Sequence, residues 1–310
     1  MPRVTVVIPS YNTASLIAGC LESVFAQTFT DFEAIVVNDG SPDTIELERV
    51  LGPYLSRIIY IKQSNKRAAG ARNTAIQRAR GEFLAFIDSD DAWYPEHLSQ
   101  QIKLLDDDTA LDLVYANSLI VTPHKQWPFM DECPSQGEAT FEALVVERCQ
   151  IPVSTVVARK NAIVKAGLFD ETLERCDDYD MWLRTAFQGS KLAYTDRVQA
   201  RLAGARPGSL GQSNAKMLKA YWDILLKACH TLPLTYSQAS LVRRRAAGIK
   251  ALYFWEEGKV QLYNCQFDKA REFISEANHV LRMPKLELVL LGLKVAPRTT
   301  RSLALYWTQL

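Results

Sequence analysis

Three aspartates lie within four positions directly after an apolar run. The run is Phe83–Ile87, and Asp88, Asp90 and Asp91 follow it. An apolar run rich in aromatic and β-branched residues predicts a strand that is buried on both faces. Carboxylates this close repel one another unless a cation or hydrogen-bond donors compensate their charge. A hard divalent cation that holds a diphosphate would do so. The simpler alternative is a solvated acidic turn in which Asp90 or Asp91 caps the next helix.

A second acidic pair, Asp177 and Asp178, precedes an apolar pattern of helical spacing. Asp178, Met181, Trp182 and Thr185 fall on one helical face, so a helix is predicted to begin at Asp177 or Asp178. A carboxylate at a helix N-terminus is usually a cap, because it accepts hydrogen bonds from the free backbone N–H groups there.

The elements that must position these carboxylates alternate between strands and helices. The predicted strands are Val4–Ile8, Ala34–Val37, Ile58–Ile61 and Phe83–Ile87, and the predicted helices between them are Leu16–Phe25, Ile45–Leu55 and Ala68–Arg80. This rhythm indicates βαβ units and a mainly parallel sheet, an α/β fold. The first, second and fourth strands end in polar residues, and these ends are expected to line one crevice. No Gly-x-Gly-x-x-Gly follows the first strand, which counts against a dinucleotide oxidoreductase.

The middle of the chain is less regular. We expect one long or two short strands over Leu111–Val121, a loop over 123–140, a strand at Val153–Ala158 and a short helix at Lys160–Ala166. Within the loop three prolines and the lack of a period argue against a regular element.

The charge of the chain divides near residue 205. Residues 1–205 hold 20 basic and 28 acidic side chains, whereas residues 206–310 hold 16 and 7. We therefore predict two domains, 1–205 and 206–310, the second all-helical with helices over 239–257 and 258–282. Gly258, Phe267, Ala270 and Ala277 have the spacing of a tetratricopeptide-type helical hairpin.

Bulk composition is that of a globular protein. Of the 310 residues 48% are hydrophobic and 23% are charged, and the six cysteines form no Cys-x-x-Cys pair. These features predict a reduced, cytoplasmic protein. The N-terminus enters a strand at once, so no signal peptide is expected, and no apolar run reaches transmembrane length.

Five segments in this order resemble family-2 glycosyltransferases of the GT-A fold. They are VTVVIPSYN at Val4–Asn12, AIVVNDGSP at Ala34–Pro42, ARN at Ala71–Asn73, EFLAFIDSDDAW at Glu82–Trp93 and FDETLERCDDYDMWLR at Phe169–Arg184. The resemblance covers roughly residues 3–205 and does not extend to the helical tail.

The resemblance implies a binding site for UDP. Pro9, Tyr11 and Asp39 match the residues that hold uracil and ribose, and Arg72 matches an arginine that faces the nucleotide. The family often has Asn-x-Gly before the ARN segment, but this chain has Arg67 in place of the glycine.

The resemblance also implies the chemistry. Asp88 and Asp90 match the Asp-x-Asp motif that binds the diphosphate through Mg²⁺ or Mn²⁺. Asp178 matches the base that takes a proton from the acceptor hydroxyl as it attacks the anomeric carbon from the far side, which inverts the configuration. Here the base motif is Asp177-Asp178 rather than Glu-Asp.

The implied partners are a UDP-sugar and a glycan or lipid-linked acceptor, with no nucleic acid. The chain has no Gln-x-x-Arg-Trp of processive synthases, so one addition per encounter is expected. Two other functions stay open. One is a sugar-nucleotide-binding subunit with weak catalysis. The other is a nucleotidyltransferase, although Pro9–Thr13 is neither glycine-rich nor basic.

The basic tail suggests two further kinds of partner. One is an anionic membrane, on which the tail would dock from the cytoplasmic side through Arg243–Arg245 beside apolar Leu241 and Val242 and through the mixed basic and apolar C-terminus. The alternatives are apolar faces that pack within the tail with a solvated basic side, or a tail that binds protein partners or a second copy.

Overall fold

The apolar runs of the first ninety residues form four parallel strands side by side. In the computed structural model, which describes residues 1–204 and 214–301, their order is β3-β2-β1-β4. The bounds are β1 Val4–Ser10, β2 Phe32–Asp39, β3 Ile58–Gln63 and β4 Phe83–Phe86. Val6 of β1 is in register with Ala34 of β2 and with Ala85 of β4. The polar residues that follow these strands therefore lie at one edge of the sheet.

The second half of the sheet is mixed. β8 joins β4 antiparallel, and within residues 1–204 the sheet has nine strands in the order β3-β2-β1-β4-β8-β6-β9-β5, with β7 paired to β6. The remaining strands are β5 Ala92–Trp93, β6 Leu111–Val121, β7 Gln126–Pro128, β8 Val157–Arg159 and β9 Lys191–Ala203. β6 and β9 run parallel, so β9 returns the chain to the edge that carries the aspartates.

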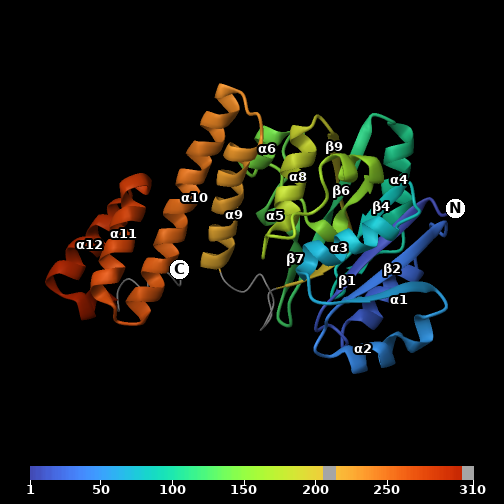
Figure 1. Ribbon diagram of the computed structural model, residues 1–310. Helices are drawn as coiled ribbons and strands as arrows, with labels where there is room; N and C mark the ends of the chain where they lie inside the picture. The colour runs from blue at the N-terminus through green and yellow to red at the C-terminus, as the bar shows by residue number, and fades with distance from the viewer. Residues whose placement is uncertain (205–213, 302–310) are drawn as a thin grey trace. The chain divides into compact units, whose positions relative to one another are not determined.

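Helices cover both faces of the sheet (Figure 1), as the continuous burial of β1, β2 and β4 requires. Their bounds are α1 Ile17–Phe25, α2 Thr44–Leu51, α3 Arg67–Arg78, α4 His97–Asp107, α5 Phe129–Glu132, α6 Phe141–Val145, α7 Lys160–Lys165 and α8 Asp177–Phe187. Val6 and Ile8 of β1 share one core cluster with apolar residues of α1, α2 and α4. On the opposite face, Phe86 of β4 lies 6.1 Å from the ring of Trp182 in α8.

Two expectations for the middle of the chain were wrong in detail, and one strand was missed. The predicted strand Val153–Ala158 is a 3₁₀ turn over Val153–Thr155 followed by the short β8. The predicted loop 123–140 contains β7 and α5. β9 was not predicted at all, because side chains 195–198 in its middle are partly or largely exposed and its pairing with β6 is interrupted by register shifts.

The chain divides into two compact units, Met1–Arg206 and Pro207–Leu310, which we call the N-terminal and C-terminal units. The described part of the C-terminal unit is helical (orange to red in Figure 1), with α9 Asn214–Thr231, α10 Tyr236–Tyr263, α11 Phe267–Leu281 and α12 Pro284–Val295. A capping box between Thr235 and Gln238 begins α10. Ile274 and Ala277 of α11 pack with Leu286 and Val289 of α12 in a separate core.

The predicted break at residue 258 was wrong. Gly258 lies inside the continuous helix α10, and the turn of the α10–α11 hairpin comes at residues 264–266. Among the described residues, no helix combines the length and apolar character needed to span a bilayer.

The close approach of Gly81 to β1 gives a stability prediction. A Cβ on Gly81 would lie 2.5 Å from the backbone N of Thr5 and 2.7 Å from the carbonyl carbon of Val4. Backbone cannot move aside as a side chain can, so Gly81→Ala is expected to lower the free energy of unfolding by about 1–3 kcal/mol. Urea unfolding followed by fluorescence measures this change.

Gly19 is the matched control. It is exposed in α1, and no atom lies within 4 Å of the position that a Cβ would take there. Gly19→Ala should therefore leave stability unchanged or raise it by up to about 1 kcal/mol, because alanine favours helix. Equal urea midpoints for the two variants would contradict the packing at Gly81.

Candidate active site

The loop after β4 presents Asp88 and Asp90 with partly exposed side chains. Ser89 between them is buried, and its hydroxyl oxygen lies 2.8 Å from that of Thr13. The Thr13 hydroxyl in turn lies 3.0 Å from Ser10 Oγ at the end of β1. These contacts join the loop after β1 to the loop after β4, so the polar ends of the two strands lie side by side.

Asp91, the third carboxylate, is a structural link. Its Oδ2 accepts a hydrogen bond from Ser154 Oγ at 2.5 Å, and its Oδ1 accepts one from the Ala203 backbone N–H at 2.8 Å. Burial, together with the charges of Asp90 and Asp88, raises the pKa of Asp91 well above its ordinary value. Asp88 and Asp90 are therefore the members of the cluster that face solvent.

Arg72 of α3 lies between two carboxylates from different elements. Its Nη2 donates to Asp88 Oδ1 at 2.6 Å and its Nη1 donates to Asp177 Oδ2 at 2.7 Å. Only 5% of its side chain is exposed, and its guanidinium carbon lies 5.5 Å from the centre of the Phe169 ring. Burial acts to lower the pKa of Arg72, but Asp88 and Asp177 outweigh it, so the net shift is upward. The resemblance predicted an arginine that faces the nucleotide, and the structure places Arg72 in direct contact with Asp88, one of the two carboxylates predicted to bind the diphosphate through a metal.

Asn73, the next residue of α3, fixes the chain that leads to α8. Its Nδ2 donates to the Phe169 carbonyl at 2.8 Å and to Glu171 Oε1 at 3.0 Å. Its Oδ1 accepts from the Phe169 backbone N–H at 2.9 Å. This two-way contact holds residues 169–171 against α3, and it gives the ARN segment a structural role besides that of Arg72.

The N-terminus of α8 brings Asp178 toward the same place. Cys176 precedes the helix with φ of 56°, a left-handed conformation that strains a residue with a Cβ. Asp177 follows and is held by Arg72, and the next side chain, Asp178, is partly exposed. Its Oδ1 accepts from the Tyr179 backbone N–H at 2.8 Å.

The surroundings of Asp178 favour its protonated form. Burial is the largest cause, and the negative charge of Asp177 adds to it, while Arg72 opposes both. Together they raise the pKa of Asp178 to about 6. A carboxylate with this pKa is mostly ionised at pH 7 and binds protons more readily than a surface aspartate, which suits a general base.

The residues predicted to hold a nucleotide come from the ends of β1 and β2. Pro9 is half-buried in β1, and Tyr11 just beyond it is 52% exposed. Asp39 is buried, and its Oδ1 accepts hydrogen bonds from Gln63 Nε2 at 2.7 Å and from the Lys66 backbone N–H at 2.8 Å. These contacts fix the orientation of the Asp39 side chain.

Backbone conformation explains two positions beside Asp39. Gly40 has φ of +64°, and a Cβ there would lie 2.7 Å from the backbone N of Asn65. Arg67 also has positive φ, 63°, at the position where the family often has glycine. Glycine adopts this left-handed backbone conformation without cost, whereas a residue with a Cβ does not. Arg67 therefore carries a strain on the order of 1–3 kcal/mol.

The carboxylate oxygens of Asp88 and Asp90 fit a divalent metal whose remaining ligands would be phosphate oxygens of the substrate and water. Among residues 1–204 and 214–301, no group of three His, Cys, Asp or Glu side chains is placed to hold an ion. Mg²⁺ is commonly bound by one or two carboxylates plus phosphate oxygens and water. Two partly exposed carboxylates at a strand end match that pattern. Asp91 is linked to Asp88 through Ser154, which donates to the Asp91 carboxylate and accepts from the Asp88 backbone N–H.

Several residues of the site were not found from the sequence. Ser154 is buried in the 3₁₀ turn, where it donates to Asp91 and accepts from the Asp88 backbone N–H at 3.0 Å. Trp93 Nε1 donates to the Ser154 carbonyl at 2.7 Å. A single serine between Val153 and Thr155 carries no motif, so only the folded chain reveals this contact.

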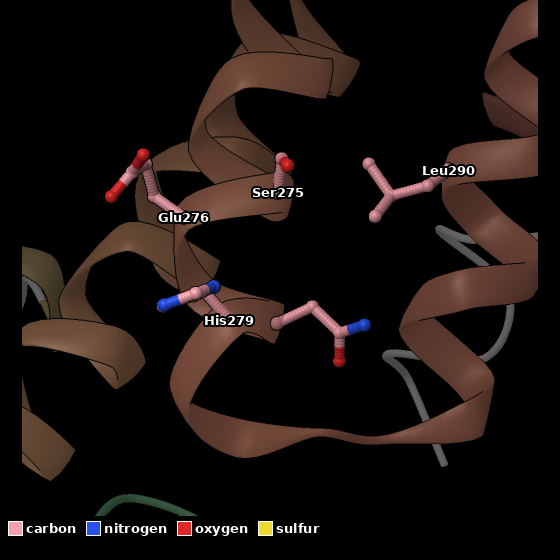
Figure 2. Close-up of a pocket in the computed structure, with 5 residues that line it drawn as sticks. Ser275, Glu276, His279 and Leu290 are labelled. Atoms are coloured by element: carbon pink, nitrogen blue, oxygen red, sulfur yellow. The ribbon is translucent and has the colours of Figure 1, made fainter.

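A separate hollow of about 450 Å³ lies in the C-terminal unit between α11 and α12. Figure 2 shows Ser275, Glu276 and His279 on one helix and Leu290 on the facing helix; Asn278 completes the lining. None of the residues predicted for catalysis lines it. The carboxylates and the arginine described above all belong to the N-terminal unit.

Comparisons with known sequences cover most of the chain. The family model for glycosyl transferase family 2 matches residues 5–142. A protein of Escherichia coli named UDP-Glc:alpha-D-GlcNAc-diphosphoundecaprenol beta-1,3-glucosyltransferase WfaP is 30% identical over 240 residues. That match covers 75% of this chain and 90% of the relative.

Two solved structures resemble the whole chain. TarS 1-349 of S. aureus in complex with UDP-GlcNAc has a TM-score of 0.63 at 16% identity, and the match covers 100% of this chain and 92% of that one. Mannosyltransferase PcManGT of Pyrobaculum calidifontis in complex with GDP-Man and Mn²⁺ has a TM-score of 0.65 at 20% identity, with 98% and 84% covered.

The raised pKa of Asp178 predicts how its replacement changes stability with pH. With a pKa of about 6 in the fold and about 3.9 when unfolded, Asp178 loses stabilising free energy as pH rises through this window. Asp178→Asn keeps the shape and cannot ionise, so it should raise the melting temperature at pH 8 and raise it by less at pH 5, which lies within the window. Thermal unfolding at the two pH values measures the difference.

Asp180 provides the control on the same helix. Its carboxylate pairs with Arg184 at 2.7 Å, so Asp180→Asn should lower the melting temperature at both pH values. A loss of stability in Asp178→Asn at pH 8 as large as that of Asp180→Asn would mean that Asp178 is a helix cap.

Proposed function

We propose that this chain, which belongs to glycosyltransferase family 2, transfers a sugar from a UDP-sugar to a hydroxyl of a glycan or lipid-linked acceptor. It has the GT-A fold with a helical C-terminal region, as its sequence predicted. The reaction proceeds with inversion. The observation that carries this proposal is the Arg72 bridge, which links Asp88 at the diphosphate end to Asp177, the neighbour of the base Asp178.

Donor binding is assigned to the ends of β1 and β2. The exposed ring of Tyr11 offers a surface on which uracil can stack, and Pro9 lies beside it. Asp39, oriented by Gln63 and the Lys66 backbone, accepts the uracil N–H. The nucleotide UDP is supported by the names of the WfaP relative and of the TarS complex.

The diphosphate is assigned to Asp88 and Asp90 through Mg²⁺ or Mn²⁺. Such a cation, when bound, neutralises the negative charge that builds on the departing UDP. The Mn²⁺ named in the PcManGT complex supports a divalent ion in this fold. Arg72 donates to Asp88 Oδ1 at 2.6 Å, and this contact limits the rotamers from which the second oxygen of Asp88 can bind a cation.

Asp178 is assigned as the general base. Its carboxylate takes the proton of the acceptor hydroxyl while the hydroxyl oxygen bonds to the anomeric carbon and the bond from that carbon to the UDP oxygen breaks. Attack opposite the leaving group inverts the configuration. The neighbouring carboxylate of Asp177 is instead occupied by Arg72, whose Nη1 donates to it at 2.7 Å.

The acceptor is assigned from relatives and from sequence. WfaP is named for a diphosphoundecaprenol acceptor, which supports a lipid-linked glycan for this chain and a place of action at the cytoplasmic side of a membrane. The chain lacks Gln-x-x-Arg-Trp, so it adds a single sugar per encounter. Residues of the 123–150 region, including β7 and α5, are the candidates for acceptor specificity because variable loops carry such contacts.

Metal-dependent nucleotide binding tests the donor site. UDP should raise the melting temperature when Mg²⁺ or Mn²⁺ is present and much less when EDTA is present, because a ligand of the native state adds stability by mass action. Asp90→Ala should abolish this rise. Asp107→Ala, which removes an exposed carboxylate from α4, should leave it intact.

Further arms of the same assay separate the alternatives. Equal stabilisation by UDP in EDTA would contradict the metal role, and a larger rise with GDP would contradict the choice of nucleotide. Release of UDP from a panel of UDP-sugars with a diphosphate-lipid acceptor then tests turnover. Binding without release from any of the sugars would favour a sugar-nucleotide-binding subunit.

A further inference from the structure

Helix α12 is apolar on two opposite sides. Leu286, Val289 and Leu293 are at most 5% exposed and pack against α10 and α11. A helix with one such side normally presents charged or polar residues to water on the other. On α12 the other side carries Leu288, Leu291 and Val295, which are 61%, 61% and 78% exposed. We call these three residues the outer stripe.

The outer stripe is a single continuous surface. Its members are spaced by three and four residues, so they lie one above the other on the helix. Val280 at the end of α11 and Met283 at the start of the turn into α12 are 47% and 45% exposed, and they extend the apolar residues toward the N-terminus of the helix. The inner side already fills the core of the C-terminal unit, so the stripe needs another apolar surface to leave water.

Basic residues surround the outer stripe. Lys285 and Lys294 are exposed on α12 itself, and Arg282 and Arg298 are exposed just before and after it. Over residues 280–301 the sequence has five basic side chains and one acidic side chain, Glu287. An apolar stripe with a basic border matches the interface of an anionic bilayer, where acyl chains lie below negatively charged headgroups.

We propose that the outer stripe of α12 docks the protein on an anionic lipid surface. A second copy of the chain is the less favourable occupant, because a symmetric pairing of two stripes would place both basic borders together. Docking deepens the proposed function and rests on it in one respect, since it would hold the enzyme at the surface where a lipid-linked acceptor lies. The binding itself needs neither donor nor acceptor.

The other basic and apolar segment of the tail does not offer such a surface. Val242 beside Arg243–Arg245 is buried, and Leu241 is half-buried in α10. The apolar side chains of that segment are thus already largely removed from water. On α12 the inner side follows the same rule, and only the outer stripe departs from it.

Vesicle sedimentation of the full-length protein tests the proposal without substrate. The protein should pellet with phosphatidylcholine vesicles that contain phosphatidylglycerol and remain in solution with phosphatidylcholine alone, and high salt should release it. Leu288→Glu/Leu291→Glu should weaken binding on the order of tenfold or more. Lys285→Gln/Lys294→Gln should weaken it by about fivefold for each charge removed.

Ile45→Glu is the matched control. Ile45 is an aliphatic side chain of α2, 88% exposed, in the N-terminal unit, so its replacement should leave vesicle binding unchanged. Circular dichroism and UDP-dependent stabilisation confirm that each variant is folded and separate loss of docking from loss of the donor site.

Three outcomes would overturn the proposal. They are binding to neither vesicle, equal salt-insensitive binding to both, and binding that Ile45→Glu weakens as much as the α12 variants do. A dimer in sedimentation velocity that Leu288→Glu/Leu291→Glu dissociates, together with no vesicle binding, would assign the outer stripe to a second copy instead.

Discussion

A buried guanidinium is the constraint on which the N-terminal unit depends. Arg72 has 5% of its side chain exposed, and a charge in that position is tolerated only if it is paired and hydrogen-bonded. Its partners, Asp88 and Asp177, come from the end of β4 and the start of α8. Their carboxylate oxygens lie 2.6 and 2.7 Å from the guanidinium nitrogens of Arg72, so both elements must stay next to α3. Removing either carboxylate leaves a buried charge with half its compensation. The residues that join the two halves of the active site are therefore also residues that stabilise the fold.

The members of these ion pairs also act on the pKa of Asp178. Burial raises this pKa most, the charge of Asp177 raises it further, Arg72 lowers it, and the balance is a value of about 6. A surface aspartate has the same side chain but a much lower proton affinity. The strained backbone of Cys176 is kept because it turns the chain so that Asp177 meets Arg72 while Asp178 stays accessible. The backbone strain at Cys176 lowers stability, but it positions Asp178 where a base can take the proton of the acceptor hydroxyl.

How far the sequence could predict the structure depended on the kind of signal. The strands β1, β2 and β4 were predicted because each is a run of apolar residues buried on both faces, a local pattern that burial alone explains. The edge strand β3 was predicted from its apolar run Ile58–Ile61, although most of its residues are only partly buried. β9 was missed because it has neither such a run nor a regular alternation, and its pairing with β6 is long-range. Asp88 and Asp90 were identified together with Asp91, but no local pattern distinguishes Asp91 as the member held by Ser154. Arg72 was recognised by its motif, whereas its two partners lie 16 and 105 residues away and become visible only in the fold.

The role of Asp178 is tested by comparing binding with turnover in Asp178→Asn. If Asp178 is the base, the variant should bind a UDP-sugar and metal with the affinity of the unaltered protein and lose turnover on the order of 10²–10⁴-fold. Titration calorimetry and UDP release in the presence of acceptor measure the two quantities on one preparation. A variant that retains turnover, or one whose loss of turnover follows a matching loss of UDP-sugar affinity, would contradict the assignment of Asp178 as the base.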